Sequence, residues 1–208
     1  MNPDEFIDAV ASENETALSR LGSSKSLYAD TEGEMEPEDV LTAAATAEHH
    51  AAETYEAWAD DEDGDVTDAF AETAAEERDH YETVVGELDD HEPGGIPAIQ
   101  EYLRDLDGTV ERIGGFVGRT LAAEKSKAQM TGFFTGQADP QTASLFRGMG
   151  DDLDAQLERA TELLEAECGD DEDCWERAED AATGAIQAAY DEYTESLESM
   201  GVNPKPVC

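Results

Sequence analysis

Hydrophobic residues recur every three to four positions along most of the chain, and no segment shows the two-residue alternation of a half-buried strand. Ala and Glu, both strong helix formers, fill many of the positions between them. This pattern predicts an all-α protein with a loop over residues 22–36 and a short helix within 96–108. The long helices are expected at residues 3–21, 37–60, 65–89, 109–135, 140–167 and 173–200.

The segments between the expected helices differ in length. DDEDGD at 60–65 and GQADPQ at 136–141 are short polar turns, whereas a longer connector that begins with HEPGG joins the two helix pairs. Short, long, short is the pattern of a four-helix bundle with one crossover, as in ferritin-like folds. We therefore expect a single ferritin-like domain over residues 1–208. Its parts are an N-terminal helix and loop (1–36), a first hairpin (37–90), a crossover (91–108), a second hairpin (109–167) and a C-terminal helix and tail (168–208).

The two expected hairpins can be laid over each other at an offset of 76 residues without a gap. Glu48 then falls on Glu124, and Phe70 falls on Phe146. Overall identity is low, but these matches fall at positions expected to face inward. The second hairpin therefore has the pattern of a diverged copy of the first.

Three carboxylates and one imidazole lie on helix faces that are otherwise apolar. Glu77 lies in the middle of a stripe of Ala, Phe, Tyr, Val and Leu, and His80 follows it one turn later. Glu48 and Glu124 hold central places in the corresponding stripes of the helices at 37–60 and 109–135. Isolated buried carboxylates are very costly and repel one another, whereas a bound cation removes both penalties. These four residues are therefore candidate metal ligands.

Each candidate also has a plainer interpretation. Glu-x-x-His is a weak motif in a chain so rich in Glu, so Glu77 and His80 can equally belong to a solvated acidic face. Glu124 can instead be the partner of Lys125 or Lys127 in a neighbouring unit.

The spacing Ala47-Glu48-x₆-Tyr55 followed by Phe70-x₆-Glu77-x-x-His80 resembles the rubrerythrin branch of the ferritin-like superfamily, over residues 39–166. The resemblance implies that Glu48, Glu77, His80 and Glu124 bind iron, as one or two ions, with manganese or zinc as alternatives. It also implies an iron-dependent oxidoreductase whose partner is a small-molecule oxidant or a metal ion: peroxide, oxygen or ferrous iron.

The sequence departs from that family in the second hairpin. At the 76-residue offset, the second Glu-x-x-His falls on Leu153 and Gln156, of which Leu cannot bind a metal. A shift of register could bring Asp152 inward instead. The chain also has no C-x-x-C pair, so it lacks the rubredoxin-type iron centre of true rubrerythrins. The alternative is therefore a non-catalytic helical scaffold, or a regulatory protein-binding module, that kept the fold and lost the metal chemistry.

The charge is extreme, with 53 acidic and 12 basic residues and a net charge of −41. A charge this high can indicate disorder. It can also indicate a halophilic protein, because in molar salt the Debye length falls to about 3 Å. The amphipathic helices favour the second interpretation. A surface this negative argues against nucleic acid and anionic membranes as partners. No apolar run is long enough to cross a membrane and no signal peptide is visible, so a cytoplasmic location is expected.

The remaining histidines and the tyrosines near the proposed site have simpler expected roles. His49 and His50 point away from the face of Glu48 and are expected to be exposed, and His91 is expected to be structural or exposed. Tyr55 and Tyr81 are expected to pack in the core.

Cys168 and Cys174 flank GDDED, a segment that predicts a turn, and could pair if oxidised. Free thiols in a reducing cytoplasm are the expectation. Cys208 supports no interpretation.

The last expected helix carries an apolar stripe that we expect to be core or a dimer seam: Trp175, Ala182, Ile186, Ala189, Tyr193, Leu197 and Met200. Small residues at Ala182, Ala185 and Ala189 allow a second helix to approach closely. A homo-oligomer, specifically a dimer, is expected on this ground.

Overall fold

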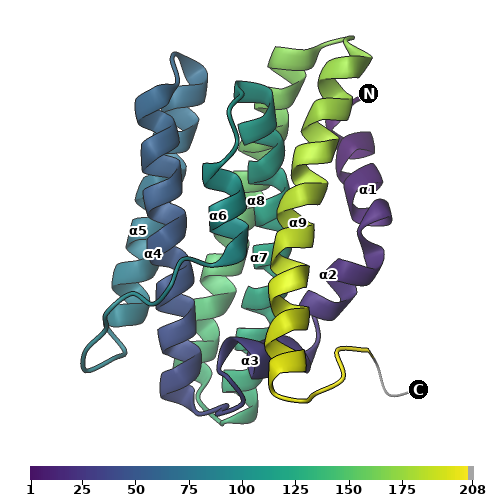
Figure 1. The fold of residues 1–208 in the computed structure, drawn as a ribbon. Helices are drawn as coiled ribbons and strands as arrows, with labels where there is room; N and C mark the ends of the chain where they lie inside the picture. Colours follow the sequence, from purple (N-terminus) through teal and green to yellow (C-terminus); the bar gives the residue numbers. More distant parts are fainter. Residues whose placement is uncertain (206–208) are drawn as a thin grey trace.

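The computed structural model describes residues 1–205, and this part of the chain is all-α, with no strand (Figure 1). The all-α part of the predicted fold class is thus confirmed. The helices are α1 (Pro3–Glu13), α2 (Glu15–Leu21), α3 (Ser24–Asp30), α4 (Pro37–Asp61), α5 (Asp65–Val85), α6 (Ala98–Arg104), α7 (Thr109–Gly136), α8 (Pro140–Cys168) and α9 (Glu172–Ser199).

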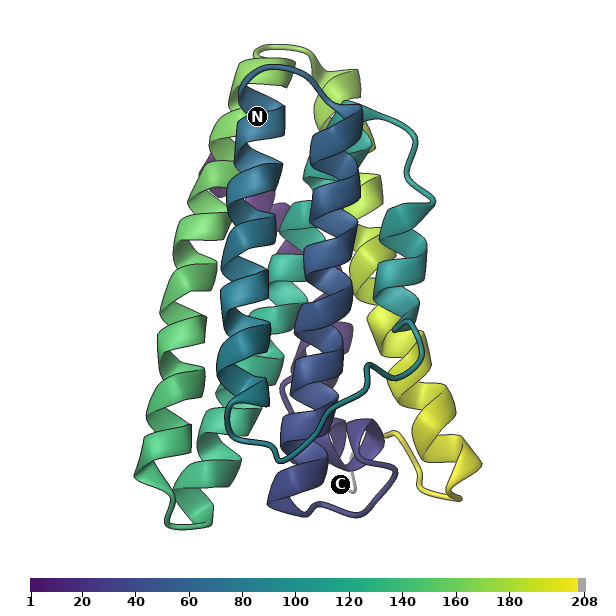
Figure 2. The ribbon, with the colours of Figure 1, turned by 90° about the vertical axis from the view of Figure 1, so that its left-hand side faces the viewer.

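The long helices pack as antiparallel neighbours joined by tight turns. α4 packs along α5, α7 packs along α8, and α5 and α8 bring the two hairpins together. Figure 2 shows α4 and α5 side by side, with the connector crossing α4 on its way to α6. The turn before α8 is closed by Asp139, whose carboxylate accepts hydrogen bonds from the backbone N–H groups of Gln141 and Thr142. Asp171 caps α9 in the same way.

α7 lies inside the assembly, because it packs against both α8 and α9. Two glycines of α7 make the contact with α9 very close. A Cβ atom on Gly114 would come within 2.3 Å of the Ala178 carbonyl oxygen, and one on Gly118 within 2.2 Å of the Ala182 carbonyl oxygen. The small residues of α9 therefore pack against α7 of the same chain. The expected dimer stays a prediction. Most of the apolar stripe of α9 is core: Trp175, Ala182, Ile186, Tyr193 and Leu197 are buried.

The N-terminal region differs from the sequence-based expectation. The single helix predicted over 3–21 breaks at Asn14, whose buried side chain donates hydrogen bonds to the Val10 carbonyl and the Thr183 hydroxyl, both at 2.9 Å. The Gln187 amide donates back to Asn14 at 2.8 Å. The predicted loop over 22–36 contains α3, because Leu27 and Ala29 bury their side chains against the bundle. Tertiary contacts thus override the polar composition of this segment.

Cys168 and Cys174 form a disulfide bond between the end of α8 and the first turn of α9. The expectation of free thiols was wrong for this pair. The tight turn explains the pairing, because it brings the two Cα atoms to 5.3 Å, within the range that a disulfide spans. Cys208 lies outside the described residues.

Within residues 1–205, no helix has both the length and the apolar character that a membrane span requires.

Candidate functional site

Glu48 of α4 meets Glu77 and His80 of α5 in the interior of the protein. Both carboxylates are 0% exposed, and His80 is buried. One ligand atom from each residue lies within 4.8 Å of the others. The Nδ1 atom of His80 is 3.9 Å from Glu48 Oε2 and 3.8 Å from Glu77 Oε2. Three of the four predicted ligands therefore form a buried carboxylate–histidine cluster that could hold a metal ion.

Two basic side chains from α7 complete this cluster. The Arg119 guanidinium donates hydrogen bonds to both carboxylate oxygens of Glu77, at 2.7 and 2.8 Å. Lys127 donates to Glu48. Both basic side chains are buried. They supply inside the protein the positive charge that a metal ion would otherwise supply.

Sequence reasoning placed Lys127 only as a possible partner of Glu124 and overlooked Arg119. A signal was available, because the chain has only 12 basic residues and four of them, including Arg119 and Lys127, lie on a helix otherwise dominated by small and apolar residues. A buried carboxylate requires a positive partner, and these two were the nearest candidates on the second hairpin.

The structure does not bring Glu124 into the cluster. Its side chain is half-buried and pairs at 3.9 Å with Lys125 of the same chain, whereas the predicted alternative was a lysine of a neighbouring unit. The rotation of α7 explains the outcome. Gly114 and Gly118 must face α9, which turns Arg119 toward the first hairpin, and Glu124 lies about 140° further round the helix.

α8 contributes hydrogen bonds to the cluster where the repeat predicted metal ligands. Leu153 is a buried core residue. Gln156 is also buried, and its amide nitrogen donates to Glu77 at 2.9 Å. Asp152, the residue that a register shift would bring inward, has its Oδ2 atom 3.0 Å from His80 Nε2 although its side chain is 57% exposed.

The environment pushes the pKa values of the two carboxylates in opposite directions. Burial, together with the neighbouring charge of Glu77, raises the pKa of Glu48 against the opposing effect of Lys127. Burial would also raise the pKa of Glu77, but the Arg119 charge and several hydrogen bonds hold it well below its usual value. For His80, burial is outweighed by the carboxylates of Glu77, Glu48 and Asp152, which raise its pKa.

Two atoms of the cluster lack a hydrogen-bond partner within residues 1–205. They are Glu48 Oε2 and His80 Nδ1, and both are buried. These atoms are the ones that a water molecule or a cation between the side chains would satisfy.

Of the other predictions for aromatic and histidine residues, those for Tyr55 and His91 agree with the structure and the one for His50 does not. Tyr55 packs between Trp58 and Phe116 in the core, as predicted. His91 is half-buried, and its two ring nitrogens lie 3.3 Å from the hydroxyls of Thr46 and Tyr81. These contacts give it a structural role, one of the two that were predicted. His50 is buried, so the expectation that it is exposed was wrong. The connector explains this, because it covers His50 and places the Gly94 carbonyl 3.1 Å from its Nε2 atom.

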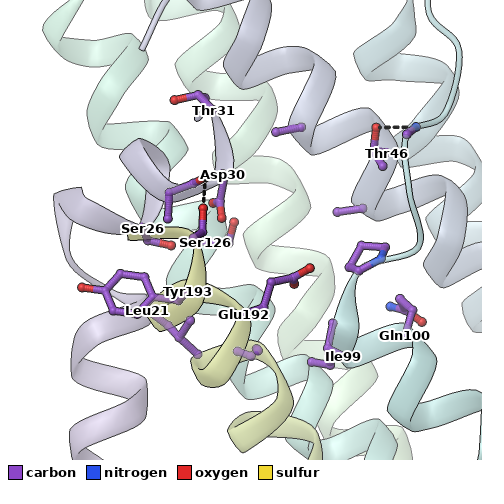
Figure 3. A pocket seen from close by; sticks show the side chains of 18 of the residues that line it. Leu21, Ser26, Asp30, Thr31, Thr46, Ile99, Gln100, Ser126, Glu192 and Tyr193 are labelled. Carbon is purple, nitrogen blue, oxygen red and sulfur yellow. Dashed lines mark hydrogen bonds between the residues drawn. The ribbon is translucent and has the colours of Figure 1, made fainter. Parts of the chain in front are cut away.

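Of the buried cluster, Glu48 reaches a large cleft, together with the two basic residues Arg119 and Lys127. The cleft has a volume of about 980 Å³ and is lined by α3, α4, α6, α7, α9 and the connector, with Glu48, Arg119 and Lys127 at its floor. Figure 3 shows Asp30 and Glu192 on one side of this cleft and Thr46 and Gln100 on the other. The surrounding protein and the charge of Glu192 raise the pKa of Asp30 to about 7, against a hydrogen bond from Ser26.

No protein-family model, no curated protein and no solved structure matches this chain. Fold and site together define an all-helical protein whose buried carboxylate–histidine cluster is neutralised by an arginine and a lysine of the same chain.

Proposed function

We propose that this chain is a ferritin-like helical protein of rubrerythrin type that acts as a non-catalytic binding protein and not as a two-iron enzyme. The single observation that carries the proposal is the pairing of Glu77 with Arg119 and of Glu48 with Lys127. Two buried carboxylates need two positive charges nearby, and α7 provides both.

The residues present do not fit a two-iron centre. A second ion would need ligands from the second hairpin, where the cluster meets Arg119, Lys127, Leu153 and Gln156. None of these four is a carboxylate or an imidazole, the ligand types of carboxylate-bridged iron sites. The second hairpin also brings Asp152 to 3.0 Å from His80 Nε2, but with 57% of its side chain exposed it would be a single carboxylate for a second ion. A divalent ion placed beside Arg119 and Lys127 would also be repelled by both.

The ferritin-like arrangement itself is part of this proposal. It is supported by the two antiparallel hairpins and by the long connector between them. It is also supported by the position of the polar cluster, whose residues on α4 and α5 contact basic residues of α7.

We place the bound ligand, a small organic cation, in this cleft against the carboxylates of its wall and not at its floor, where Arg119 and Lys127 would repel it. Asp30 and Glu192 offer carboxylates, and Ile99 and Tyr193 offer apolar walls. Gln100 adds an independent indication. It is 2% exposed and lines the cleft, yet its Oε1 atom accepts no hydrogen bond within residues 1–205. A ligand ammonium group would satisfy this oxygen.

The test of the ligand site uses spermidine as the probe, followed by thermal unfolding and calorimetry in molar KCl. Spermidine is expected to raise the melting temperature, whereas a dicarboxylate of similar length is expected to have no effect. The D30N/E192Q variant is expected to lose the response. If spermidine raises the melting temperature of D30N/E192Q as much as that of the unaltered chain, the cleft is not the ligand site.

The test for loss of metal chemistry is anaerobic binding of Fe²⁺ to the H49Q/H50Q variant. His49 and His50 form, with Glu53, a second group of possible metal ligands, so this variant leaves the buried cluster as the one such group within residues 1–205. Well below one equivalent is the expected result. Binding of one equivalent of Fe²⁺ to H49Q/H50Q, with loss of that binding when E77Q is added, would contradict the proposal.

A second candidate function is favoured by the unpartnered atoms Glu48 Oε2 and His80 Nδ1. A single iron, manganese or zinc ion would be held by Glu48, Glu77 and His80, and a redox-active ion would supply one-electron chemistry toward peroxide or oxygen. The same titration separates the two candidates, because only this one expects a full equivalent of Fe²⁺.

A further inference from the structure

A second group of possible metal ligands lies on α4, away from the buried cluster. His49, His50 and Glu53 each offer an atom within 4.8 Å of the others. The Nε2 atom of His49 is 3.5 Å from Glu53 Oε1, and the Nδ1 atom of His50 is 3.3 Å from Glu53 Oε2. The two carboxylate oxygens of Glu53 thus face one imidazole each.

The connector fixes the tautomer of His50. Its Nε2 atom lies 3.1 Å from the Gly94 carbonyl oxygen, which can only accept a hydrogen bond. In the neutral ring the proton is therefore on Nε2, and the lone pair is on Nδ1, the atom that faces Glu53. A backbone carbonyl that orients the second nitrogen is the usual support of a metal-binding histidine.

A basic side chain currently shares this group. The Arg104 guanidinium donates to Glu53 Oε2 at 3.1 Å and lies 3.5 Å from His50 Nδ1. Arg104 also donates to the Thr54 hydroxyl at 3.0 Å and to the His50 carbonyl at 3.1 Å, and 29% of its side chain is exposed, so a bound ion has to displace it from Glu53. It competes for the same lone pairs that a metal ion would use.

We propose that His49, His50 and Glu53 form a binding site for a divalent ion of the zinc, copper or nickel class. Imidazole nitrogens favour these ions, whereas magnesium and calcium favour oxygen ligands alone. Three protein ligands leave at least one coordination position for water or a small ligand. The hydrogen bond from His50 to Gly94 would couple occupancy of this site to the position of the connector.

The experiment is calorimetric titration of the metal-stripped full chain with Zn²⁺, in molar KCl and with excess Mg²⁺ to fill non-specific acidic sites. One equivalent of Zn²⁺ is expected to bind. H49Q and H50Q are each expected to weaken binding by at least about tenfold, as loss of a metal-site residue does. R104Q is expected to strengthen it, because the competing cation is gone.

The four histidines of the chain provide matched controls. H80Q alters the buried cluster and H91Q alters the start of the connector, and both are expected to leave the tight Zn²⁺ site intact. The circular dichroism of each variant is recorded first. If H50Q does not fold, H49Q decides, because 30% of the His49 side chain is exposed and its loss leaves the core unchanged.

Three results would overturn the site. These are no Zn²⁺ binding above the Mg²⁺ background, an affinity in H49Q equal to that of the unaltered chain, and loss of binding in H80Q alone. The last result would move the ion to Glu48, Glu77 and His80.

Discussion

Arg119 on α7 holds Glu77 on α5 by two hydrogen bonds of 2.7 and 2.8 Å, one to each carboxylate oxygen, and both side chains are buried. This two-point contact joins the two hairpins at their centre. A planar guanidinium and a carboxylate fit each other in this geometry, and Gln156 of α8 donates a further hydrogen bond to Glu77.

Replacing Arg119 by Met is expected to lower the free energy of unfolding by about 3–5 kcal/mol, because it leaves an ionised carboxylate buried without its main partner. Combining R119M with E77Q is expected to restore part of that loss. Urea unfolding in molar KCl measures both. The control is R78Q, which breaks an exposed pair with Glu56 and is expected to change stability by at most about 1 kcal/mol. If R119M costs no more than R78Q, the pair does not stabilise the bundle.

Replacing Lys127 by Met tests whether this lysine occupies the place of a metal ion. The change leaves Glu48 with Arg119 at 3.7 Å as its nearest charged partner and removes the charge that repels an incoming ion. In the H49Q/H50Q background, K127M is expected to be less stable and to bind Co²⁺, with a melting temperature that rises with Co²⁺ concentration. The same background with Lys127 retained is the control. If K127M fails to bind Co²⁺, the idea that the lysine replaces an ion does not hold.

Asp30 gives a pH dependence with a defined sign. Its pKa is raised to about 7 in the folded protein from 3.8, so the folded state binds the proton more tightly than the unfolded state. The contribution of Asp30 to stability therefore falls as pH rises from about 4 to about 7, and stays low above that. The D30N variant does not titrate here, so its stability relative to the unaltered chain is expected to increase over the same window. Urea unfolding at pH 5 and pH 8 checks this, and a constant difference would contradict it.

The close contact of α7 with α9 predicts opposite effects of Gly→Ala changes along α7. G118A forces a Cβ into the backbone of Ala182 and is expected to destabilise the protein by about 1–3 kcal/mol, as overpacking does. G132A has open space around it and is expected to stabilise the helix by about 0.5–1 kcal/mol. Thermal unfolding of the two variants measures the contrast. Equal effects would mean that the glycine face does not set the distance between the helices.

Much of the local structure followed from the sequence, since hydrophobic period, turn residues and helix capping act over a few positions. The five long helices from α4 onward, apart from α6, begin and end within a few residues of the expected positions. The joint placement of Glu48, Glu77 and His80 was also predictable. Glu77 and His80 share one face because they are three residues apart, and the short turn aligns the middle of α4 with the middle of α5.

Which residues of α7 contact that cluster depends on how α7 is rotated about its own axis. The local sequence pattern does not specify this rotation. Glu124 and Arg119 are both on α7, and periodicity alone favoured Glu124 as the inward residue. The fit of Gly114 and Gly118 against α9 instead turned Arg119 and Lys127 toward the carboxylates. The break at Asn14 and the Cys168–Cys174 bond have the same origin, because each depends on which segments packing brings together. Helix positions are properties of short stretches of chain, whereas the charge balance of the buried site is a property of the contacts between helices.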